Sequence, residues 1–433
     1  MIASRAWAGK HYAVLGLARS GAATVRALLA GGARVTAWDS DAAKRDAVAA
    51  DVGERLAIAD LDTLDLAAFD ALVVSPGVPL NRHPLAARAH EAGIPVVGDI
   101  ELFAEARADL PPHKVVGITG TNGKSTTTAL VKHILDTAGV PALMGGNIGL
   151  PILGQDPLPA GGVYVLELSS YQIDLTRSLD CEVAVLLNIT PDHLDRYDGF
   201  DGYAASKARL FAMQAADHDA VIGIGDGPSE GIGRSLSARG EHLTKIAPGV
   251  CMDQSRWPSL QGPHNAQNAL AAIAVARALG IREADIDRGL ETFSGLPHRM
   301  ERVGEIAGVA YVDDSKATNP ESTAPALGAF ARVHWILGGR AKGDDLDACL
   351  PYLDHVVAAY TIGEAGAQFA RVLAGKVASV EEAGTLDEAV RRAARAARPG
   401  HTVLLSPAAA SFDQFRDYED RGRAFRAAVE ALA

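Results

Sequence analysis

The feature that most constrains this chain is a repeated alternation of short apolar segments with alanine-rich segments of helical periodicity. Alternation of this kind is typical of parallel β-α units, in which each strand is followed by a helix that covers the sheet. In the first hundred residues the strand-like segments are 11–17, 34–41, 71–78 and 94–100, and the clearest helical segment is 20–32. The sequence therefore predicts an α/β protein built on doubly wound, mostly parallel sheets.

Two breaks divide this pattern into three parts. Pro111 and Pro112 interrupt it once, and the segment Gly-Leu-Pro-His-Arg at 295–299 interrupts it again, because proline ends helices and strands. A length of 433 residues also agrees with about three domains of ordinary size. We therefore expect domains at 1–110, 111–296 and 297–433.

Composition excludes several classes of protein. Hydrophobic residues make up 48% and charged residues 22%, which is enough apolar material for several cores. The net charge of −12 argues against general binding to nucleic acids or anionic membranes. No stretch of about 18 apolar residues occurs, so we expect no membrane span. The widely spaced Cys181, Cys251 and Cys349 are typical of reduced thiols, and we expect a cytoplasmic protein.

The strongest local motif is Gly117-Ile-Thr-Gly-Thr-Asn-Gly-Lys-Ser-Thr126, between an apolar strand and a helical segment. Glycines let backbone N–H groups approach phosphate oxygens, and the N-terminus of a helix favours negative charge. Lys124 supplies a cation for the β- and γ-phosphates, and Ser125 a hydroxyl for Mg²⁺. The spacing is a variant of the P-loop, since Ile118 stands where the first glycine is expected. The plain alternative is a glycine-rich turn with a solvated lysine.

Three further residues follow strands or lie on a helix near this motif. Glu167 ends the strand 163–168, where a carboxylate can complete a Mg²⁺ shell or simply close the strand as a surface acid. His193 follows the next strand, and a lone histidine there is more often structural than catalytic. The residues around Lys207 indicate only a lysine on the solvent-exposed face of a helix.

A second glycine-containing turn, Gly16-Leu-Ala-Arg-Ser-Gly21, follows the first strand, with Asp39 about twenty residues later. It approximates the dinucleotide fingerprint, but Ala18 replaces the glycine that allows close approach of a pyrophosphate. The segment predicts a diphosphate or nucleotide at a helix N-terminus, with a simple strand–helix turn as the alternative.

Seven segments together resemble the Mur ligase family along nearly the whole chain. They are GITGTNGKST, LELSSYQ, NITPDHLDRY, HNAQNALAA, GLPHRME, DDSKATNP and LLSPAAASFDQF. The last two are similar to family members that add D-glutamate rather than L-alanine, a diamino acid or a dipeptide. The resemblance implies an N-terminal Rossmann-like domain for a UDP-sugar, a central P-loop-type ATPase domain with a mostly parallel sheet, and a C-terminal Rossmann-like domain for the amino acid.

The resemblance implies an ATP-dependent ligase that adds D-glutamate to UDP-N-acetylmuramoyl-L-alanine through an acyl phosphate, in peptidoglycan precursor synthesis. Its implied cofactors are ATP and two Mg²⁺ ions, with Mn²⁺ as a substitute, and the implied state is a monomer. Three alternatives remain open from the sequence: a sister ligase for another amino acid, a nicotinamide-dependent oxidoreductase using the Gly16 turn, and a nucleotide-binding protein without catalysis.

The resemblance also assigns residues to sites. ATP contacts are expected at Gly117, Thr119, Gly120, Thr121, Asn122, Gly123, Lys124, Ser125, Thr126, Asn268, Arg299, Asp314 and Lys316. UDP-sugar contacts are expected at Ser20, Asp39, Ser75, Gly77, Asn147 and His193, with Asp39 accepting a hydrogen bond from the uracil imide. D-Glutamate contacts are expected at Thr318, Lys342, Ser411 and Tyr418, the last standing where relatives often have Phe.

Metal-site and catalytic roles complete the implied assignment. The metal site is expected at Ser125, Glu167, His193 and Lys207, and the catalytic residues at Lys124, His193 and Lys207. Lys207 matches a lysine that is carbamylated in most members. A carbamate anion there can help to hold the second Mg²⁺.

Overall fold

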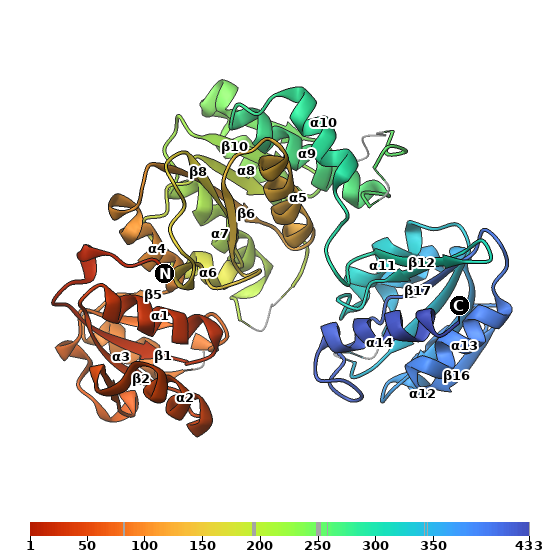
Figure 1. Ribbon diagram of the computed structural model, residues 1–433, viewed down its shortest axis with the longest axis horizontal. Coiled ribbons are helices and arrows are strands. Elements are labelled where there is room, and N and C mark those ends of the chain that lie inside the picture. Colours follow the sequence, from red (N-terminus) through yellow and green to blue (C-terminus); the bar gives the residue numbers. More distant parts are fainter. Residues whose placement is uncertain are drawn as a thin grey trace. The chain divides into compact units, whose positions relative to one another are not determined.

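The computed structural model describes residues 1–80, 83–192, 196–247, 253–257, 259–341, 343 and 345–432. The predicted α/β class with mostly parallel sheets is confirmed (Figure 1). The chain forms two compact units: unit 1 is Met1–Pro248 with Gln267–Leu290, and unit 2 is Gly249–Ala266 with Glu291–Ala433. Among the described residues, no helix is both long enough and apolar enough to cross a membrane.

The N-terminal sheet of unit 1 has the strand order β3-β2-β1-β4-β5, and its strands pair in parallel. The strands are β1 (His11–Leu15), β2 (Arg34–Trp38), β3 (Leu56–Ile58), β4 (Ala71–Val74) and β5 (Val96–Val97). The helices are α1 (Arg19–Ala30), α2 (Ala42–Val52), α3 (Pro84–Glu91) and α4 (Asp99–Ala106), with 3₁₀ turns at Arg5–Trp7, Gly53–Arg55, Leu61–Thr63, Leu66–Ala68 and Arg107–Asp109.

The expected strand at 94–100 is shorter than predicted. Only Val96–Val97 is extended, and Gly98 is already the N-cap of α4. Glu101 lies in the first turn of that helix, where an acidic side chain interacts favourably with the positive end of the helix dipole. Helix formation therefore ends the strand early.

The central sheet of unit 1 has the order β11-β10-β9-β6-β8-β7 and is also parallel. The strands are β6 (His113–Thr119), β7 (Ala142–Gly146), β8 (Gly162–Glu167), β9 (Val183–Leu186), β10 (Asp219–Gly223) and β11 (Leu243–Ile246). The helices are α5 (Lys124–Thr137), α6 (Ser170–Asp174), α7 (Gly199–Ala212), α8 (Gly227–Ser235), α9 (Pro263–Ala278) and α10 (Glu283–Thr292), with 3₁₀ turns at Ile152–Gly154 and Ser237–His242. Because the strands are parallel, their carboxyl ends share one edge, where ligands bind in such sheets.

The sheet of unit 2 has the order β12-β13-β17-β14-β15-β16; β12 is antiparallel to β13, and the other neighbours are parallel. The strands are β12 (Glu301–Ile306), β13 (Val309–Asp313), β14 (Val333–Gly338), β15 (Val356–Ile362), β16 (Val380–Gly384) and β17 (Thr402–Leu405). The helices are α11 (Pro320–Gly328), α12 (Gly366–Leu373), α13 (Leu386–Ala396) and α14 (Tyr418–Glu430), with a 3₁₀ segment at Asp347–His355.

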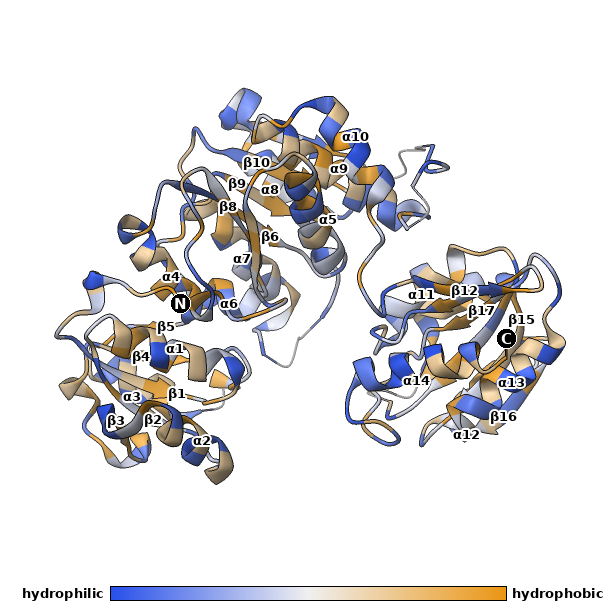
Figure 2. Ribbon diagram, in the orientation of Figure 1, coloured by the Kyte–Doolittle hydropathy of each residue, from blue (hydrophilic) through white to orange (hydrophobic). Residues whose placement is uncertain are grey.

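Apolar side chains on the strands form the cores, and Figure 2 shows the hydrophobic colour mainly on the strands of the sheets. In unit 1 a single cluster of buried side chains includes residues of both sheets. In this cluster Phe103, on α4, meets Tyr164, on β8, edge to face at 5.0 Å. The expected boundary at residue 110 falls between the turn Arg107–Asp109 and β6, within this shared core, and the three-domain division stays a prediction.

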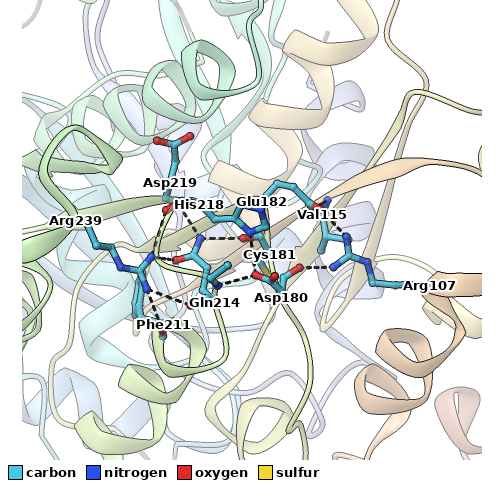
Figure 3. A network of polar contacts seen from close by, with 11 residues as sticks. Arg107, Val115, Asp180, Cys181, Glu182, Phe211, Gln214, His218, Asp219 and Arg239 are labelled. Carbon is cyan, nitrogen blue, oxygen red and sulfur yellow. Dashed lines mark hydrogen bonds and ion pairs between the residues drawn. The ribbon is translucent and has the colours of Figure 1, made fainter.

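A polar network holds the amino edge of the central sheet (Figure 3). Glu182, just before β9, accepts hydrogen bonds from Arg107 Nη2 at 2.7 Å and from the backbone N–H of Val115 on β6 at 2.5 Å. Gln214 Nε2 donates to the carbonyls of Cys181 and Asp219, each at 2.9 Å. These bonds fix β6, β9 and β10 in register. The opposite, carboxyl edge of the same strands carries the candidate site.

Candidate active site

The glycine-rich motif forms a turn between β6 and α5. The strand ends at Thr119 and the helix begins at Lys124, with Gly123 as its N-cap. Gly123 has φ +84°, and a Cβ atom there would lie 2.3 Å from Asn268 Oδ1 on α9. Only glycine fits this conformation and this close approach. The turn therefore brings the N-terminus of α5 to the edge of the sheet, as a phosphate site requires.

Two lysines meet at this turn. Lys124 Nζ donates to the carbonyls of Gly120 at 2.9 Å and Thr121 at 2.8 Å. Lys207 Nζ, on α7, donates to the same Gly120 carbonyl at 2.9 Å and lies 4.6 Å from the centre of the Tyr203 ring. Burial, reinforced by the charge of Lys124, lowers the pKa of Lys207 well below its ordinary value. The two lysine nitrogens thus converge on one carbonyl of the turn.

Residues that follow β9 fix the shape of the turn. The backbone N–H of Thr121 donates to the Asn188 carbonyl, and that of Asn122 donates to Asn188 Oδ1, both at 2.9 Å. Thr121 Oγ1 lies 3.2 Å from the Tyr203 hydroxyl. Sequence reasoning did not assign roles to Asn188 or Tyr203. The position of Asn188 directly after an apolar strand was the available signal.

Glu167 ends β8 beside this turn and is almost fully buried, with 2% of its surface exposed. Its Oε1 accepts a hydrogen bond from Asn147 Nδ2 at 2.8 Å. Its Oε2 is buried and has no hydrogen-bond partner within the described part of the chain. A buried carboxylate oxygen of this kind is costly without a partner and suits a hard cation such as Mg²⁺. Ser125, buried in the first turn of α5, adds a hydroxyl.

The remaining predicted residues of the turn have distinct placements. Gly117 lies inside β6, where a Cβ atom would stand 2.7 Å from Cys181 Sγ. Packing explains this glycine, and its contact with ATP stays a prediction. Thr119 Oγ1 donates to the Leu168 carbonyl at 2.8 Å, and Asn268 Oδ1 accepts from Thr127 Oγ1 at 3.2 Å. Thr126 follows Ser125 in the first turn of α5.

A cavity of about 680 Å³ opens in unit 1 at the carboxyl edge of the N-terminal sheet. Five of the residues predicted to contact a UDP-sugar line it: Ser20, Asp39, Ser75, Gly77 and Asn147. Its wall also contains residues that sequence reasoning missed, among them Arg19, Trp38, Lys44, His83 and Gln172. Trp38 ends β2, and that position at a carboxyl edge was the signal that could have identified it.

Asp39 in this cavity accepts hydrogen bonds from the protein backbone. Its Oδ2 accepts from the Leu17 backbone N–H at 2.8 Å, and its Oδ1 accepts from the Asp41 backbone N–H at 2.9 Å. These bonds and the nearby Lys44 lower the pKa of Asp39 despite its burial, which acts in the opposite direction. Ser75 Oγ likewise donates to the Gly16 carbonyl at 2.8 Å. Both side chains shape the turn before α1, and their contacts with a ligand stay predictions.

In unit 2 the predicted residues gather after neighbouring parallel strands. Asp314, directly after β13, is buried, and Ser406 Oγ donates to its Oδ2 at 2.7 Å. Burial raises the pKa of Asp314 to about 7. Lys316 Nζ donates to the Tyr418 hydroxyl at 3.1 Å and lies 4.6 Å from the centre of its ring. The extra hydroxyl of Tyr418 is therefore a partner for Lys316. Thr318 and the buried Ser411 follow β13 and β17.

Arg299 stands between two strained residues. His298 has φ +61° and Met300 has φ +50°, a region that side-chain-bearing residues rarely adopt. His298 Nδ1 lies 2.7 Å from Oδ2 of Asp313, and the Met300 backbone N–H donates to Asp314 Oδ1 at 3.2 Å. The hydrogen bond with Asp313 raises the pKa of His298. These contacts hold the backbone on both sides of Arg299.

Two predicted residues, His193 and Lys342, lie outside the described residues. The expected ATP contacts are divided between the units: Lys124, its turn and Asn268 belong to unit 1, whereas Arg299, Asp314 and Lys316 belong to unit 2. That these two groups of residues bind the same ATP molecule stays a prediction.

Comparison with known proteins gives consistent similarities along the chain. Three family models match successive parts: "Mur ligase MurD-like, N-terminal domain" at 10–98, "Mur ligase middle domain" at 118–247 and "Mur ligase, glutamate ligase domain" at 298–409. The chain is 64% identical to the UDP-N-acetylmuramoylalanine–D-glutamate ligase of Novosphingobium aromaticivorans, over 100% of this chain and 97% of that protein. It is 62% identical to the ligase of the same name from Sphingopyxis alaskensis, over 100% of both.

Solved structures show the same fold at low sequence identity. A MurF ligase from Thermotoga maritima in complex with ADP matches with TM-score 0.61 and 16% identity, over 98% of this chain and 96% of that one. The UDP-N-acetylmuramate–alanine ligase MurC from the same organism matches with TM-score 0.59 and 16% identity, over 98% and 100%.

Proposed function

The chain belongs to the Mur ligase family, and we propose that it joins D-glutamate to UDP-N-acetylmuramoyl-L-alanine with conversion of ATP to ADP, in peptidoglycan precursor synthesis. One observation carries the proposal. Asn147 lines the cavity of unit 1 and also donates a hydrogen bond to Glu167, the buried carboxylate beside the phosphate turn. A long substrate in the cavity would therefore extend toward the turn that is proposed to bind ATP.

The chemistry requires that a poor electrophile be activated. The carboxylate of the UDP-sugar peptide attacks the γ-phosphorus of ATP, ADP leaves, and an acyl phosphate forms. The amine of D-glutamate then attacks the acyl carbon, and phosphate leaves. The first step brings two anions together, so cations must offset their repulsion. Lys124 meets this need in unit 1, and the guanidinium of Arg299 and the amino group of Lys316 would add to it.

The donor set suits Mg²⁺, and we propose that two such ions bind, for which Mn²⁺ could substitute. The orphaned Oε2 of Glu167 and the hydroxyl of Ser125 are oxygen ligands of the type Mg²⁺ prefers, and His193 would join them. Bound metal ions would neutralise the phosphate charge during transfer.

Burial, reinforced by the charge of Lys124, lowers the pKa of Lys207 and so favours its neutral amine. A neutral amine is the form that adds CO₂, so we expect Lys207 to carry a carbamate. That anion would place a negative charge beside Lys124 and offer an oxygen ligand for the second Mg²⁺.

For the amino acid, we propose that Thr318, Lys342, Ser411 and Tyr418 hold D-glutamate, with Lys342 pairing with its side-chain carboxylate. For the UDP-sugar, Ser20, Asp39, Ser75, Gly77, Asn147 and His193 form the proposed contact set. We also propose three domains at 1–110, 111–296 and 297–433, a monomer, and a place in the cytoplasm, where ATP is supplied.

The test measures phosphate release from ATP with Mg²⁺ and UDP-N-acetylmuramoyl-L-alanine, against a panel of D-glutamate, L-alanine, L-lysine and meso-diaminopimelate. Release that depends on both the UDP-sugar and D-glutamate is expected, with a product heavier by one glutamyl residue. Release with another amino acid would keep the mechanism and change the substrate. No release with any pair would overturn the proposal.

The alternatives weighed from the sequence have weaker support. An oxidoreductase that uses the Gly16 turn would not explain the glycine-rich turn at Gly120–Lys124. A protein that only binds nucleotides would not explain the cavity of unit 1. Relatives that match over the full chain are named as ligases of D-glutamate. Titration with NADH, followed by its fluorescence, should show no binding.

A further inference from the structure

Arg421 is a buried arginine beneath the carboxyl edge of the sheet in unit 2. It lies in the first turns of α14, and none of its surface is exposed. Its guanidinium donates to Ser315 Oγ at 3.0 Å, and to the carbonyls of Ser315 at 2.8 Å, Ala409 at 3.0 Å and Gly338 at 3.3 Å. Ser315 Oγ in turn donates to the Tyr418 carbonyl at 2.8 Å.

These acceptors belong to three different loops. Ser315 follows β13, Gly338 ends β14, and Ala409 follows β17. The three strands are parallel neighbours, in the order β13-β17-β14. One planar side chain with fixed donor directions therefore ties together the loops that leave three adjacent strands.

The same three loops carry the residues proposed to bind the amino acid. Thr318 lies three residues after Ser315, Ser411 two residues after Ala409, and Lys342 four residues after Gly338 in the sequence. Tyr418 starts the helix that carries Arg421 itself. A change in the Arg421 contacts would consequently disturb the described members of this set, Thr318, Ser411 and Tyr418.

The charge of Arg421 is also unusual. All of its hydrogen-bond acceptors among the described residues are neutral oxygens, and no carboxylate forms an ion pair with it there. Burial lowers its pKa to about 10, while the charges of Asp413 and Asp313 act in the opposite direction. It remains protonated at neutral pH. A buried cation without a direct counter-ion attracts an anion to the surface above it, because screening by water is weak there.

We propose that Arg421 is a positioning and specificity-determining residue that fixes the three loops for D-glutamate and supplies a buried positive charge that favours a dicarboxylic amino acid. This inference rests on the proposed function. It concerns chiefly the amino-acid step. Arg421 acts through the loops and through space. Because its acceptor Ser315 lies between Asp314 and Lys316, which are proposed to contact ATP, a smaller effect on ATP is expected as well.

The test compares steady-state kinetics of Arg421→Lys and Arg421→Met with the unmodified chain. Both variants lose the planar guanidinium that spans the three loops, but only the methionine variant loses the charge and every donor. We expect the KM for D-glutamate to rise about tenfold or more in Arg421→Lys and further in Arg421→Met, while the KM for ATP changes by less than about threefold. Arg423→Lys is the matched control, because Arg423 is exposed and its charge pairs with Asp420.

Ser315→Ala is the second variant if the Arg421 variants do not fold. It removes one acceptor of Arg421 and leaves the charge in place, so a smaller rise in the KM for D-glutamate is expected. Equal rises in the KM values for D-glutamate and ATP, or a loss of kcat alone, would overturn the inference. Equal KM values for the lysine and methionine variants would overturn the part that concerns charge. If the unmodified chain does not consume D-glutamate, the proposed function itself fails.

Discussion

Asp99→Asn is expected to stabilise unit 1, and to do so more at pH 8 than at pH 5. Asp99 is the first residue of α4, and only 3% of its surface is exposed. The backbone N–H groups of Asp99 and Ile100 and the side chain of Gln172 lie nearby, but neither carboxylate oxygen has a hydrogen-bond partner of good geometry among the described residues. Burial therefore dominates and raises the pKa of Asp99 to about 6.

The magnitude follows from the difference between the folded and unfolded chains. Ionising Asp99 in the folded chain costs about 3 kcal/mol more than in the unfolded chain, at about 1.4 kcal/mol for each unit between a pKa of about 6 and the ordinary value of 3.8. Between these pKa values the folded chain binds more protons, so its stability falls as the pH rises. At pH 5 about half of the cost is present, and above pH 7 nearly all of it. Asparagine carries no charge and avoids this cost.

The assay is urea denaturation at pH 5 and pH 8, followed by tryptophan fluorescence. The buried Trp7 reports on unit 1, and a Trp7→Phe chain measured in parallel identifies the transition that belongs to this unit. The stabilisation by Asp99→Asn should be larger at pH 8 than at pH 5 by about 1 to 1.5 kcal/mol. A pH-independent difference, or destabilisation that grows toward pH 8, would refute the reasoning.

Asp109→Asn is the control with the opposite sign. The hydrogen bond from Arg5, with further ones from Ser4 and the Arg5 backbone, lowers the pKa of Asp109 to about 2. A carboxyl group with a lowered pKa stabilises the folded chain above its ordinary range. This variant should therefore be less stable than the unmodified chain at both pH values, with little change between them.

Three further substitutions test the candidate site. Lys124→Ala should lower kcat for phosphate release by about 100-fold or more, because it removes a preorganised charge, whereas Lys132→Ala, on the same helix and paired with Asp136, should not; near-normal turnover of Lys124→Ala would contradict the assignment. Lys207→Ala should lose activity that added acetate or formate partly restores, and full activity without additives would remove Lys207 from the mechanism. Trp38→Ala should raise the KM for the UDP-sugar and leave that for ATP unchanged, since Trp38 lines the cavity; an unchanged KM for the UDP-sugar would separate the cavity from substrate binding.

The central strands of the fold could be predicted from the sequence, whereas the edge strands could not. Apolar segments of strand length in the sequence mark all the central strands, which are β1, β2, β4, β6, β8, β9, β10, β13, β14, β15 and β17. Those missed, β3, β7, β11, β12 and β16, are edge strands, as is the shortened β5. Central strands of a parallel sheet are buried on both faces and read as continuous apolar runs. An edge strand such as β16, Val-Glu-Glu-Ala-Gly, lacks that signal.

In the candidate site, contacts between residues close in the sequence could be predicted, whereas contacts between distant residues could not. The turn from Gly120 to Lys124 could be predicted because its glycines, its lysine and the helix that follows are adjacent in the sequence. Lys207 meets the Gly120 carbonyl across 87 positions, and nothing in the pattern around Lys207 indicates that contact. Its pairing could be expected only from the family resemblance. Arg421, whose partners lie as many as 106 positions away, left no signal in the sequence at all.

Gly422 shows what such distant contacts impose on a single position. In isolation, alanine would favour the helix α14 by about 1 kcal/mol over glycine. In the folded chain its Cβ atom would lie 2.1 Å from His298 Nδ1 and 2.6 Å from Asp313 Oδ2. Asp313 is fully buried, so we expect the added methyl group to break the hydrogen bond between these two side chains.

Breaking that bond frees His298 from the strained conformation that holds Arg299 in place. Because small displacements of a charge at a reacting site are costly, we expect Gly422→Ala to lower kcat/KM for ATP by about 100-fold. Gly231→Ala is the matched control, since Gly231 also lies within a helix and its nearest neighbour is a flexible arginine tip at 3.8 Å. If Gly422→Ala folds and keeps a normal KM and kcat with ATP, the contact between His298 and Asp313 does not position Arg299, and the strain at this bend serves another purpose.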